Sequence, residues 1–497
     1  MKIAFVNDSC EHLGVEYISA VLKLGGHETR LFVDPLLFDD EFITIKTLNR
    51  WIDHKKKIIK ALKCYRPDLI GISVVSSFYP WAIKMARLIK IEMNTPIIMG
   101  GIHPTSIPEK IINNEAVDMV CVGEGEYPML ELANAMANGS IDTTIKNIWF
   151  KKKGKIIQNP LRPLIENLDV LPFADKDLYY SVSPHFSQSY YIAASRGCSH
   201  ECSYCCNSYL KSLYKELGVY RRQRSVKNVI SELIQAKQRY HINPVFFLDD
   251  CFGIDLQWLK EFAVEYRKKI GIKFYCMVFP DQHMEKAVEY LKQARCGEIE
   301  IGIQSWDEGV REETFHRIVS NDSMLKTMKL IKSANINLVT GDILGYPGQK
   351  EEHILKTAEI YMDIKPDRVY PFILKYFPKT QITERALLNG ELRQDDYEKI
   401  LNGHYGKYLS KDKVSADKNI MRYLFLFLLV QILPAKWAKV VIRKRLYRKF
   451  PIFFTPAIIS VLNNFSTSTF ESKVNRRSAL LRYIFFTKQL IFKHRAV

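Results

Sequence analysis

The chain has 497 residues, and at about 100 to 200 residues per domain this length predicts two to four domains. Apolar residues make up 47% of the sequence and charged residues 25%, which speaks against a disordered or fibrous protein. The net charge of +18 comes mainly from residues 411–497, which contain 18 Lys or Arg and 3 Asp or Glu, so the rest of the chain does not indicate nucleic-acid binding.

The first residues run directly into an apolar strand pattern, without the basic flank, apolar core and cleavage site of a signal peptide. We therefore expect a cytoplasmic protein. Four of the ten cysteines fall between Cys198 and Cys206. This distribution favours a metal site in a reducing compartment over a disulfide framework.

Residues 1–145 alternate short apolar runs with helix-length segments, which is typical of βαβ units. The pattern predicts an α/β domain with a doubly wound, Rossmann-like parallel sheet, whose ligands bind beyond the carboxyl ends of the strands. The expected strands are 2–7, 28–34, 69–75, 96–101 and 116–123.

Residues 146–188 are first basic and then rich in Pro and Asp, with weak periodicity, so we expect a linker or wrapping segment. A second alternating region follows over 189–400. Repeated strand and helix patterns there predict a partial or full (β/α) barrel, with its chemistry on the loops after the strands. The expected strands are 190–194, 244–248, 273–278, 298–303, 337–344 and 367–372.

Three cysteines, Cys198, Cys202 and Cys205, lie in a loop after the first strand of this barrel. Three thiolates on one loop can bind three irons of a cubane cluster and leave the fourth iron open to a substrate. Zinc is the alternative, but zinc sites usually take four ligands from two paired motifs, and the sequence has no second Cys-x2-Cys. Cys206 is a further candidate ligand, although in extended backbone it points away from Cys205.

The spacing Cys-x3-Cys-x2-Cys, with Tyr204 before the last cysteine, resembles the radical S-adenosylmethionine (SAM) superfamily. In that family the open iron of a [4Fe-4S] cluster chelates the amine and carboxylate of SAM, and an electron from the cluster releases a 5'-deoxyadenosyl radical. The resemblance implies that Tyr204 lies near the adenine. It also implies that Asp249 and Asp250 receive the amino group of SAM, with a helix cap or loop carboxylate as the alternative role.

Two later segments resemble motifs of the same family. Gly302-Ile303-Gln304-Ser305 is similar to a Gly-Ile-Glu-Ser segment near the ribose and methionine ends of SAM, with Gln304 in place of the acid. The segment from Gly341 to Gly348 resembles the strand that flanks the adenine. Gln304, Ser305 and Asp342 are therefore candidate cofactor residues.

The first domain resembles the cobalamin-binding domain that is joined to one large branch of this superfamily. The match rests on Glu11-His12-Leu13-Gly14, on Ile72-Ser73, on the segment from Gly100 to Thr105, and on Gly123-Glu124-Gly125-Glu126. Glycines after parallel strands let backbone amides approach a nucleotide tail closely. The resemblance implies cofactor contacts from Glu11, Gly14, Ser73, Gly100, Gly101, His103, Glu124 and Gly125.

The loop after the first strand lacks the Asp-x-His-x-x-Gly motif of better-known cobalamin proteins. His12 lies four residues after Asp8 and two before Gly14, so its spacing does not fit. We therefore expect cobalt without a histidine ligand from this loop. His103 is the rival candidate, but a histidine before a proline in a turn is more often structural.

Residues 401–497 form a basic region for which we expect helices, with apolar stretches at 423–433, 450–462 and 480–492. A helix of 13 residues covers roughly 20 Å against about 30 Å of hydrocarbon, so none of them is expected to span a bilayer. Two interpretations remain open: a helical cap on the barrel, or peripheral association with the inner face of the cell membrane.

The resemblance implies an enzyme whose adenosyl radical removes hydrogen from an unactivated carbon, to which methylcobalamin then supplies a methyl group. A second SAM would remethylate the cobalamin. We expect a small-molecule or lipid-like substrate, a low-potential electron donor such as flavodoxin or ferredoxin, and no nucleic acid. The alternatives are an anaerobic oxidative cyclase or other radical rearrangement of the same branch, and a non-catalytic cobalamin and cluster sensor.

Overall fold

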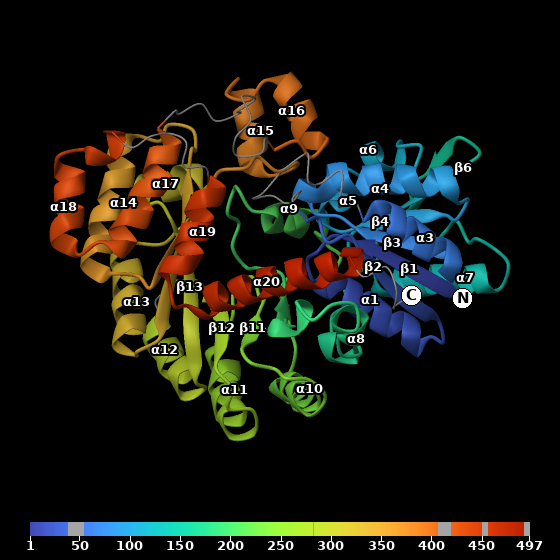
Figure 1. Cartoon of the computed structure of the whole chain (residues 1–497), viewed down its shortest axis with the longest axis horizontal. Helices are drawn as coiled ribbons and strands as arrows, with labels where there is room; N and C mark the ends of the chain where they lie inside the picture. The colour runs from blue at the N-terminus through green and yellow to red at the C-terminus, as the bar shows by residue number, and fades with distance from the viewer. Residues whose placement is uncertain (38–53, 282, 406–418, 450–455, 492–497) are drawn as a thin grey trace.

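Two β-sheets, one from each half of the chain, form the framework of the molecule (Figure 1). The computed structural model describes residues 1–37, 54–281, 283–405, 419–449 and 456–491. Helices cover both sheets, and the C-terminal helices pack against the second sheet and reach across to the first.

The first sheet has the strand order β2-β1-β3-β4-β5-β6-β7, and β1 to β5 are parallel. Side chains of β1 alternate between two hydrophobic cores, with Ile3 and Phe5 in one and Ala4 and Val6 in the other. Because helices cover both faces, these strands are apolar along most of their length. The parallel strands are β1 (Lys2–Asn7), β2 (Glu28–Val33), β3 (Leu69–Ser73), β4 (Ile97–Gly100) and β5 (Met119–Cys121).

Helices α1 (Leu13–Leu24) and α7 (Glu126–Ala137) contribute to one of these cores. Helices from the middle of the domain contribute to the other core, so the sheet is wound on both sides. This second group comprises α3 (Lys55–Tyr65), η1 (Ser76–Phe78), α4 (Tyr79–Glu92), α5 (Ile102–Ser106) and α6 (Pro108–Ile112).

The segment expected to be a linker begins by extending the first sheet. Strands β6 (Ile148–Lys152) and β7 (Lys155–Ile157) add to β5 as an antiparallel hairpin. The chain then wraps past the first domain, where Lys176 forms buried ion pairs with Glu11 (2.7 Å) and Glu16 (2.6 Å). Its short helices are η2 (Leu168–Val170), α8 (Asp177–Tyr180) and η3 (Phe186–Gln188).

The second sheet has six parallel strands in the order β15-β14-β13-β12-β11-β8. Among the described residues β8 and β15 do not pair, so the barrel is partial. Its strands are β8 (Tyr190–Ile192), β11 (Val245–Phe247), β12 (Phe274–Val278), β13 (Cys296–Gln304), β14 (Asn337–Leu344) and β15 (Arg368–Ile373).

Helices between these strands cover the outer face of the sheet (Figure 1). They are α10 (Val226–Arg239), α11 (Leu256–Lys269), α12 (Met284–Gln293), α13 (Asn321–Ser333) and α14 (Glu351–Ile364). A small hairpin of β9 (Ser195–Arg196) and β10 (Arg222–Gln223) encloses the cysteine loop and helix α9 (Cys206–Leu213). The remaining elements of this half are η4 (Val310–Thr314), α15 (Gln381–Leu388) and α16 (Gln394–Leu401).

The predicted fold class is confirmed: a doubly wound parallel sheet precedes a partial (β/α) barrel and a helical C-terminal region. Each expected strand is present, with ends shifted by at most a few residues. The β6–β7 and β9–β10 hairpins were not predicted from the sequence. Strands of two or three residues such as β7, β9 and β10 are too short for periodicity to identify.

The first apolar stretch of the C-terminal region is part of the barrel's hydrophobic core. Helix α17 (Ile420–Ile432) packs against α14 and β15, and Leu426 and Phe427 are almost fully buried. This supports the cap interpretation for that stretch. Residues 450–455 of the second stretch and Phe492 of the third lie outside the described residues. The other elements are α18 (Ala435–Arg443), η5 (Leu446–Lys449), α19 (Pro456–Ser466) and α20 (Phe470–Ile491).

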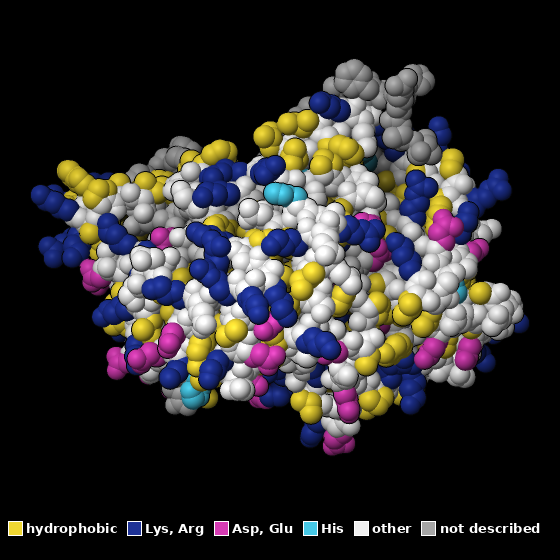
Figure 2. All heavy atoms as spheres, turned by 90° about the horizontal axis from the view of Figure 1, so that it is seen from below, with side chains coloured by type: hydrophobic (Ala, Val, Ile, Leu, Met, Phe, Trp, Pro, Cys, Tyr) yellow, Lys and Arg dark blue, Asp and Glu magenta, His cyan; other side chains and the backbone are white. Residues whose placement is uncertain are grey.

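Basic residues of α18 and η5 face outward at one end of the molecule. Figure 2 shows Lys and Arg side chains gathered at the left end, where Figure 1 places α18, beside hydrophobic ones. Within the part of the chain that the structure describes, no helix combines the length and apolarity needed to cross a membrane.

Helix α20 connects the barrel to the first domain (Figure 1). At its start, the carboxylate of Glu298 on β13 accepts hydrogen bonds from the backbone N–H groups of Phe470 (2.6 Å) and Glu471 (3.3 Å). Near its end, Phe486 is buried in the core of the first domain, and Arg482 donates to the hydroxyl of Ser9 (2.8 Å). The helix therefore bridges both halves of the molecule.

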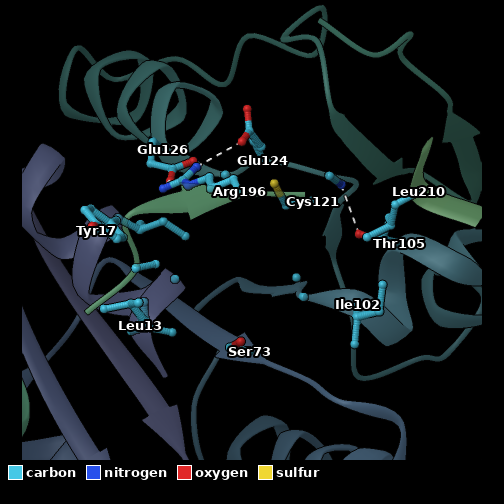
Figure 3. A pocket seen from close by; sticks show the side chains of 18 of the residues that line it. Leu13, Tyr17, Ser73, Ile102, Thr105, Cys121, Glu124, Glu126, Arg196 and Leu210 are labelled. Atoms are coloured by element: carbon cyan, nitrogen blue, oxygen red, sulfur yellow. Dashed lines mark hydrogen bonds and ion pairs between the residues drawn. The ribbon is translucent and has the colours of Figure 1, made fainter. Parts of the chain in front are cut away.

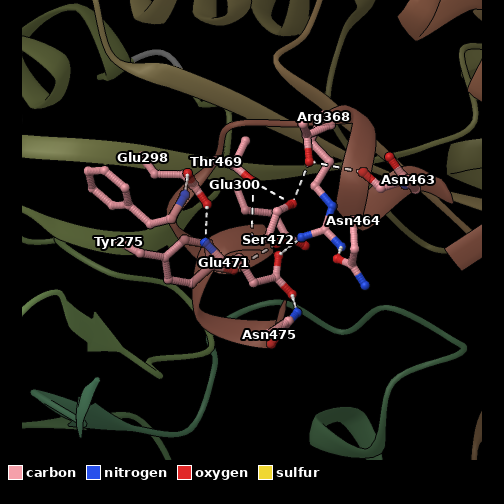
Figure 4. Close-up of polar contacts among 12 residues, drawn as sticks. Tyr275, Glu298, Glu300, Arg368, Asn463, Asn464, Thr469, Glu471, Ser472 and Asn475 are labelled. Atoms are coloured by element: carbon pink, nitrogen blue, oxygen red, sulfur yellow. Dashed lines mark hydrogen bonds and ion pairs between the residues drawn. The ribbon is translucent and has the colours of Figure 1, made fainter. Parts of the chain in front are cut away.

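The carboxylate network at the start of α20 makes the protein's stability depend on pH. Glu300 accepts a hydrogen bond from Tyr275 (2.7 Å), and burial, reinforced by the charge of Glu471, raises its pKa to about 7 (Figure 4). The folded protein thus binds this proton more tightly than the unfolded chain, so stability falls as the pH rises from about 4.5 to about 7.

Glu300→Gln keeps an acceptor for Tyr275 and removes the buried charge. We expect it to raise the free energy of unfolding by about 2 kcal/mol at pH 8 and by much less at pH 5, measured by chemical denaturation. The control is Glu261→Gln on the exposed side of α11, which should change little at either pH. An equal effect of Glu300→Gln at both pH values would contradict the prediction.

Candidate active site between the two sheets

One cavity of about 510 Å³ lies between the loops of the first sheet and the cysteine-bearing end of the barrel (Figure 3). The first domain contributes the loops that follow β1, β3, β4 and β5. The barrel contributes β9, α9 and the end of β11. Both halves of the chain therefore build the walls of the same cavity.

The cavity extends deep into the first domain. Its lining includes Phe5 and Ile98 on the strands, Val15 on α1 and Met129 on α7, so it reaches between the sheet and these two helices. An apolar slot of this kind, open at the carboxyl ends of parallel strands, suits the nucleotide tail of a corrinoid.

Several residues predicted to contact cobalamin line this cavity. They are Gly14, Ser73, Gly100, Gly101, Glu124 and Gly125. Gly101 has φ +99°, and a Cβ atom there would lie 2.8 Å from the carbonyl oxygen of Val74. A larger residue would therefore disturb the loop that forms the wall.

Glu11 and His103 are not among the residues that line the cavity. Glu11 forms the buried ion pair with Lys176. His103 is buried, lies 3.0 Å from the hydroxyl of Ser76 and packs against the ring of Tyr79; burial lowers its pKa to about 4. Both residues thus make structural contacts beside the cavity, and their contact with the cofactor stays a prediction.

His12 is likewise engaged within its own loop, where its Nε2 atom lies 3.2 Å from Asp8. This contact agrees with its unsuitable spacing for a cobalt ligand. In the cavity wall, the first domain instead offers the glycines of its loops together with polar side chains such as Ser73, Thr105 and Glu124.

The cysteine loop lies beside this cavity. Cys202 is buried, whereas Cys198 and Cys205 are partly exposed, and none of these three forms a disulfide. The backbone N–H of Cys205 donates to the carbonyl of Cys202 (3.1 Å), which turns the loop back on itself. Cys206 begins α9 and lines the cavity.

This thiol set fits an iron–sulfur cluster. Over the described ranges, no three His, Cys, Asp or Glu side chains converge as the ligands of a single metal ion would. A cubane does not require such convergence, because each thiolate binds a different iron. The three thiols lie on one short loop, and no fourth cysteine continues the Cys-x2-Cys spacing after Cys205. This pattern matches a cluster with one open iron.

Arg317, which no sequence motif indicates, supports the cysteine loop. Its Nη1 atom lies 3.9 Å from the sulfur of Cys202, while its Nη2 donates to the carbonyl of Gly302 (2.7 Å). Its guanidinium lies over the ring of Phe279, on which His200 also stacks. A fixed cation here balances the negative charge of thiolates, and it ties the cysteine loop to the Gly-Ile-Gln-Ser segment.

The two adjacent aspartates have different roles. Asp250 lines the cavity, close to Cys206 and Asn207 in the wall. Asp249 is buried and accepts hydrogen bonds from the backbone N–H of Ala194 (3.0 Å) and from Ser195; burial raises its pKa to about 6. Asp250 thus keeps its candidacy for the amino group of SAM, whereas Asp249 holds the end of β8.

The other predicted SAM residues lie outside the cavity lining. Asp342 accepts a hydrogen bond from Tyr361 of α14 (2.6 Å) and so points to the outer, helix-covered face of β14. Tyr204 packs edge-on against Phe315, and Ser305 lies 3.3 Å from the hydroxyl of Tyr346. Gln304 has φ +65°, at the irregular end of β13.

Largely buried ion pairs join the two halves of the chain at the cavity wall (Figure 3). Arg196 of β9 contacts Glu124 (2.9 Å) and Glu126 (2.6 Å), and Arg222 of β10 contacts Glu124 (3.0 Å). Burial alone would raise the pKa of Glu124, but these arginines lower it below its ordinary value. Glu124 therefore stays ionised and serves the contact between domains.

Two family models match the chain. The radical SAM superfamily matches residues 192–360, and the B12 binding domain matches residues 3–133. An uncharacterized methyltransferase of Pyrococcus horikoshii is 27% identical over 82% of this chain and 83% of its own length. The cytidylyl-2-hydroxyethylphosphonate methyltransferase of Streptomyces wedmorensis is 23% identical over 67% of this chain and 69% of its own length.

Solved structures show the same fold. The radical SAM methyltransferase TsrM of Kitasatospora setae, bound to tryptophan and a SAM analogue, has a TM-score of 0.64 at 16% identity, over 78% of this chain and 76% of its own. The cobalamin-dependent radical enzyme OxsB, bound to aqua-cobalamin and SAM, has a TM-score of 0.64 at 16% identity, over 98% of this chain and 79% of its own. This chain belongs to the radical SAM superfamily, in the branch whose members carry a B12 binding domain ahead of the radical SAM domain, and its cofactors are a [4Fe-4S] cluster, SAM and cobalamin.

Proposed function

We propose that the protein is a methyltransferase that adds a methyl group to an unactivated carbon of a small or lipid-like molecule. The observation that carries this proposal is the shared cavity, lined on one side by the corrinoid-type loops and on the other by Cys206 and Asp250 next to the cysteine loop. A methyl donor and a radical generator that face one chamber can act in turn on the same carbon. The methyltransferase relatives support the same reaction class.

The chain's own residues prepare this chamber. Cys198, Cys202 and Cys205 would hold the cluster, Arg317 would balance its charge, and Asp250 would bind the ammonium group of SAM. When bound, the cluster and SAM supply a 5'-deoxyadenosyl radical and cobalamin supplies the methyl group. The apolar residues of the wall exclude water, which protects reactive species from side reactions.

The proposed reaction consumes two molecules of SAM for each methyl group added. One would yield methionine and 5'-deoxyadenosine, which carries away the substrate hydrogen, and the other would yield S-adenosylhomocysteine in replacing the methyl group that cobalamin supplies. A low-potential flavodoxin or ferredoxin would supply the electrons. Product mass separates this reaction from an oxidative cyclisation, because only methylation adds a methylene unit.

We also propose that α18 and η5 bring the enzyme to an anionic membrane surface from the cytoplasmic side. The exposed Trp437 belongs to the same helix as Lys436, Lys439 and Arg443, and α18 and η5 contain no acidic residue. Trp prefers the boundary between water and lipid, and each Lys or Arg near an anionic surface contributes about 1 kcal/mol.

Cys202→Ala tests the radical chemistry. We expect the reconstituted, reduced wild-type protein to form 5'-deoxyadenosine from SAM, and Cys202→Ala to form only background amounts because the cluster loses a ligand. The measurement is anaerobic chromatography of the nucleoside. Cys64→Ala, at an exposed thiol on α3, is the control and should behave as the wild type. Equal nucleoside formation by Cys202→Ala would refute the assignment of the cluster ligands.

Vesicle binding tests the membrane proposal. We expect the protein to sediment with vesicles that contain phosphatidylglycerol and not with phosphatidylcholine alone. Reversing two charges, in Arg443→Glu with Lys444→Glu, should weaken this binding by at least about tenfold. The matched control reverses Lys260 and Lys268 on the exposed face of α11. If both double variants bind alike, α18 is not the contact surface.

A further inference from the structure

Four residues of the first domain, 123–126, lie where the cysteine-bearing segment of the barrel meets the cavity. We call them the corrinoid loop, because all four line the cavity below the carboxyl end of β5. The cysteine-bearing segment is residues 196–222, which runs from β9 through the three cysteines and α9 to β10. Its contacts with the corrinoid loop come from both sides of the cysteines.

Upstream of the cysteines, the contact is made by Arg196, only two residues before Cys198. Its two terminal nitrogens reach different carboxylates, Nη1 to Glu124 (2.9 Å) and Nη2 to Glu126 (2.6 Å), as Figure 3 shows. The guanidinium also lies over the ring of Tyr17. A fork that holds two carboxylates fixes orientation as well as distance.

Downstream of the cysteines, the contact is made by Tyr214. Helix α9 starts at Cys206, directly after the last cysteine of the motif, and Tyr214 follows its final residue. The Tyr214 hydroxyl accepts a hydrogen bond from the backbone N–H of Glu124 (3.0 Å). A Cβ atom on Gly123 would lie 1.7 Å from this hydroxyl, so the glycine makes room for the contact.

Arg222 closes the arrangement. Its backbone is the strand partner of Arg196 in the β9–β10 hairpin. Its side chain donates to Glu124 (3.0 Å) and to the carbonyl of Ile165 (2.9 Å). Three side chains from one cysteine-bearing segment thus converge on one short loop. Because the charged groups are largely buried, the segment cannot shift without moving the loop or leaving charges unpaired.

We propose that the corrinoid loop couples cobalamin binding to cluster assembly, with Arg196 and Tyr214 as the positioning residues. This inference rests on the proposed function, since it takes both cofactors as ligands of the chain. A cluster orders the cysteine-bearing segment, and that segment holds the corrinoid loop in place. Cobalamin then binds a loop that is already ordered, so less free energy is spent on ordering it. By thermodynamic linkage, bound cobalamin must favour cluster assembly by the same factor.

The test compares cobalamin affinity with and without the cluster. Hydroxocobalamin is titrated anaerobically into full-length apoprotein and into reconstituted protein, and binding is followed by equilibrium dialysis. We expect the wild-type dissociation constant to be about tenfold lower with the cluster in place. The coupling is expressed as the ratio of the dissociation constant without the cluster to that with the cluster. In Tyr214→Phe, which removes only the hydroxyl, and in Arg196→Lys, which removes the fork, this ratio should fall towards one while the iron content is retained.

Tyr240→Phe is the matched control, because it removes a tyrosine hydroxyl bonded to Asp177 (2.6 Å), away from the corrinoid loop. It should keep the wild-type ratio. A wild-type ratio of one, or a ratio unchanged in both variants, overturns the inference while cobalamin binding and nucleoside formation still support the proposed function. Failure of the wild type to bind cobalamin in either form would instead overturn the proposed function itself.

Discussion

The largely buried ion pairs of Arg196 with Glu124 and Glu126 are the contact on which the arrangement of the active site depends. Parallel sheets offer ligand sites only at the carboxyl ends of their strands. For two such sheets to share one cavity, these edges must face each other, and the loops between them must not slide. Charges at this junction hold the two edges in one relative position, because any other position would leave a charge unpaired.

The same junction explains how two different binding surfaces serve one chamber. The first domain contributes glycine loops and an apolar slot, which suit a large ring with a long tail. The barrel contributes a thiol loop whose charge is balanced by Arg317 and whose position is tied to Gly302. Neither surface encloses the cavity alone, so the chemistry requires both domains.

The C-terminal region also packs against both domains, although its basic composition does not indicate such a role. Helix α17 completes the core on the outer side of the barrel, and α20 runs from Glu298 in the barrel to the core around Phe486 in the first domain. Its positive charge lies mostly outside these contacts, on surfaces such as α18. The exposed positive charge of this region and its packing contacts thus lie on different surfaces.

The sequence by itself determined the two sheets and their order along the chain, and it predicts the cluster ligands. Apolar periodicity reports burial directly, and the cysteine motif is local, so neither requires knowledge of distant contacts. Only the tertiary structure decided which polar residues face the cavity. Asp249 and Asp250 are neighbours in sequence, yet one supports β8 and the other lines the wall. Arg196 and Glu124 lie far apart in the chain and meet only because the two domains pack together, and no local pattern encodes such a pair.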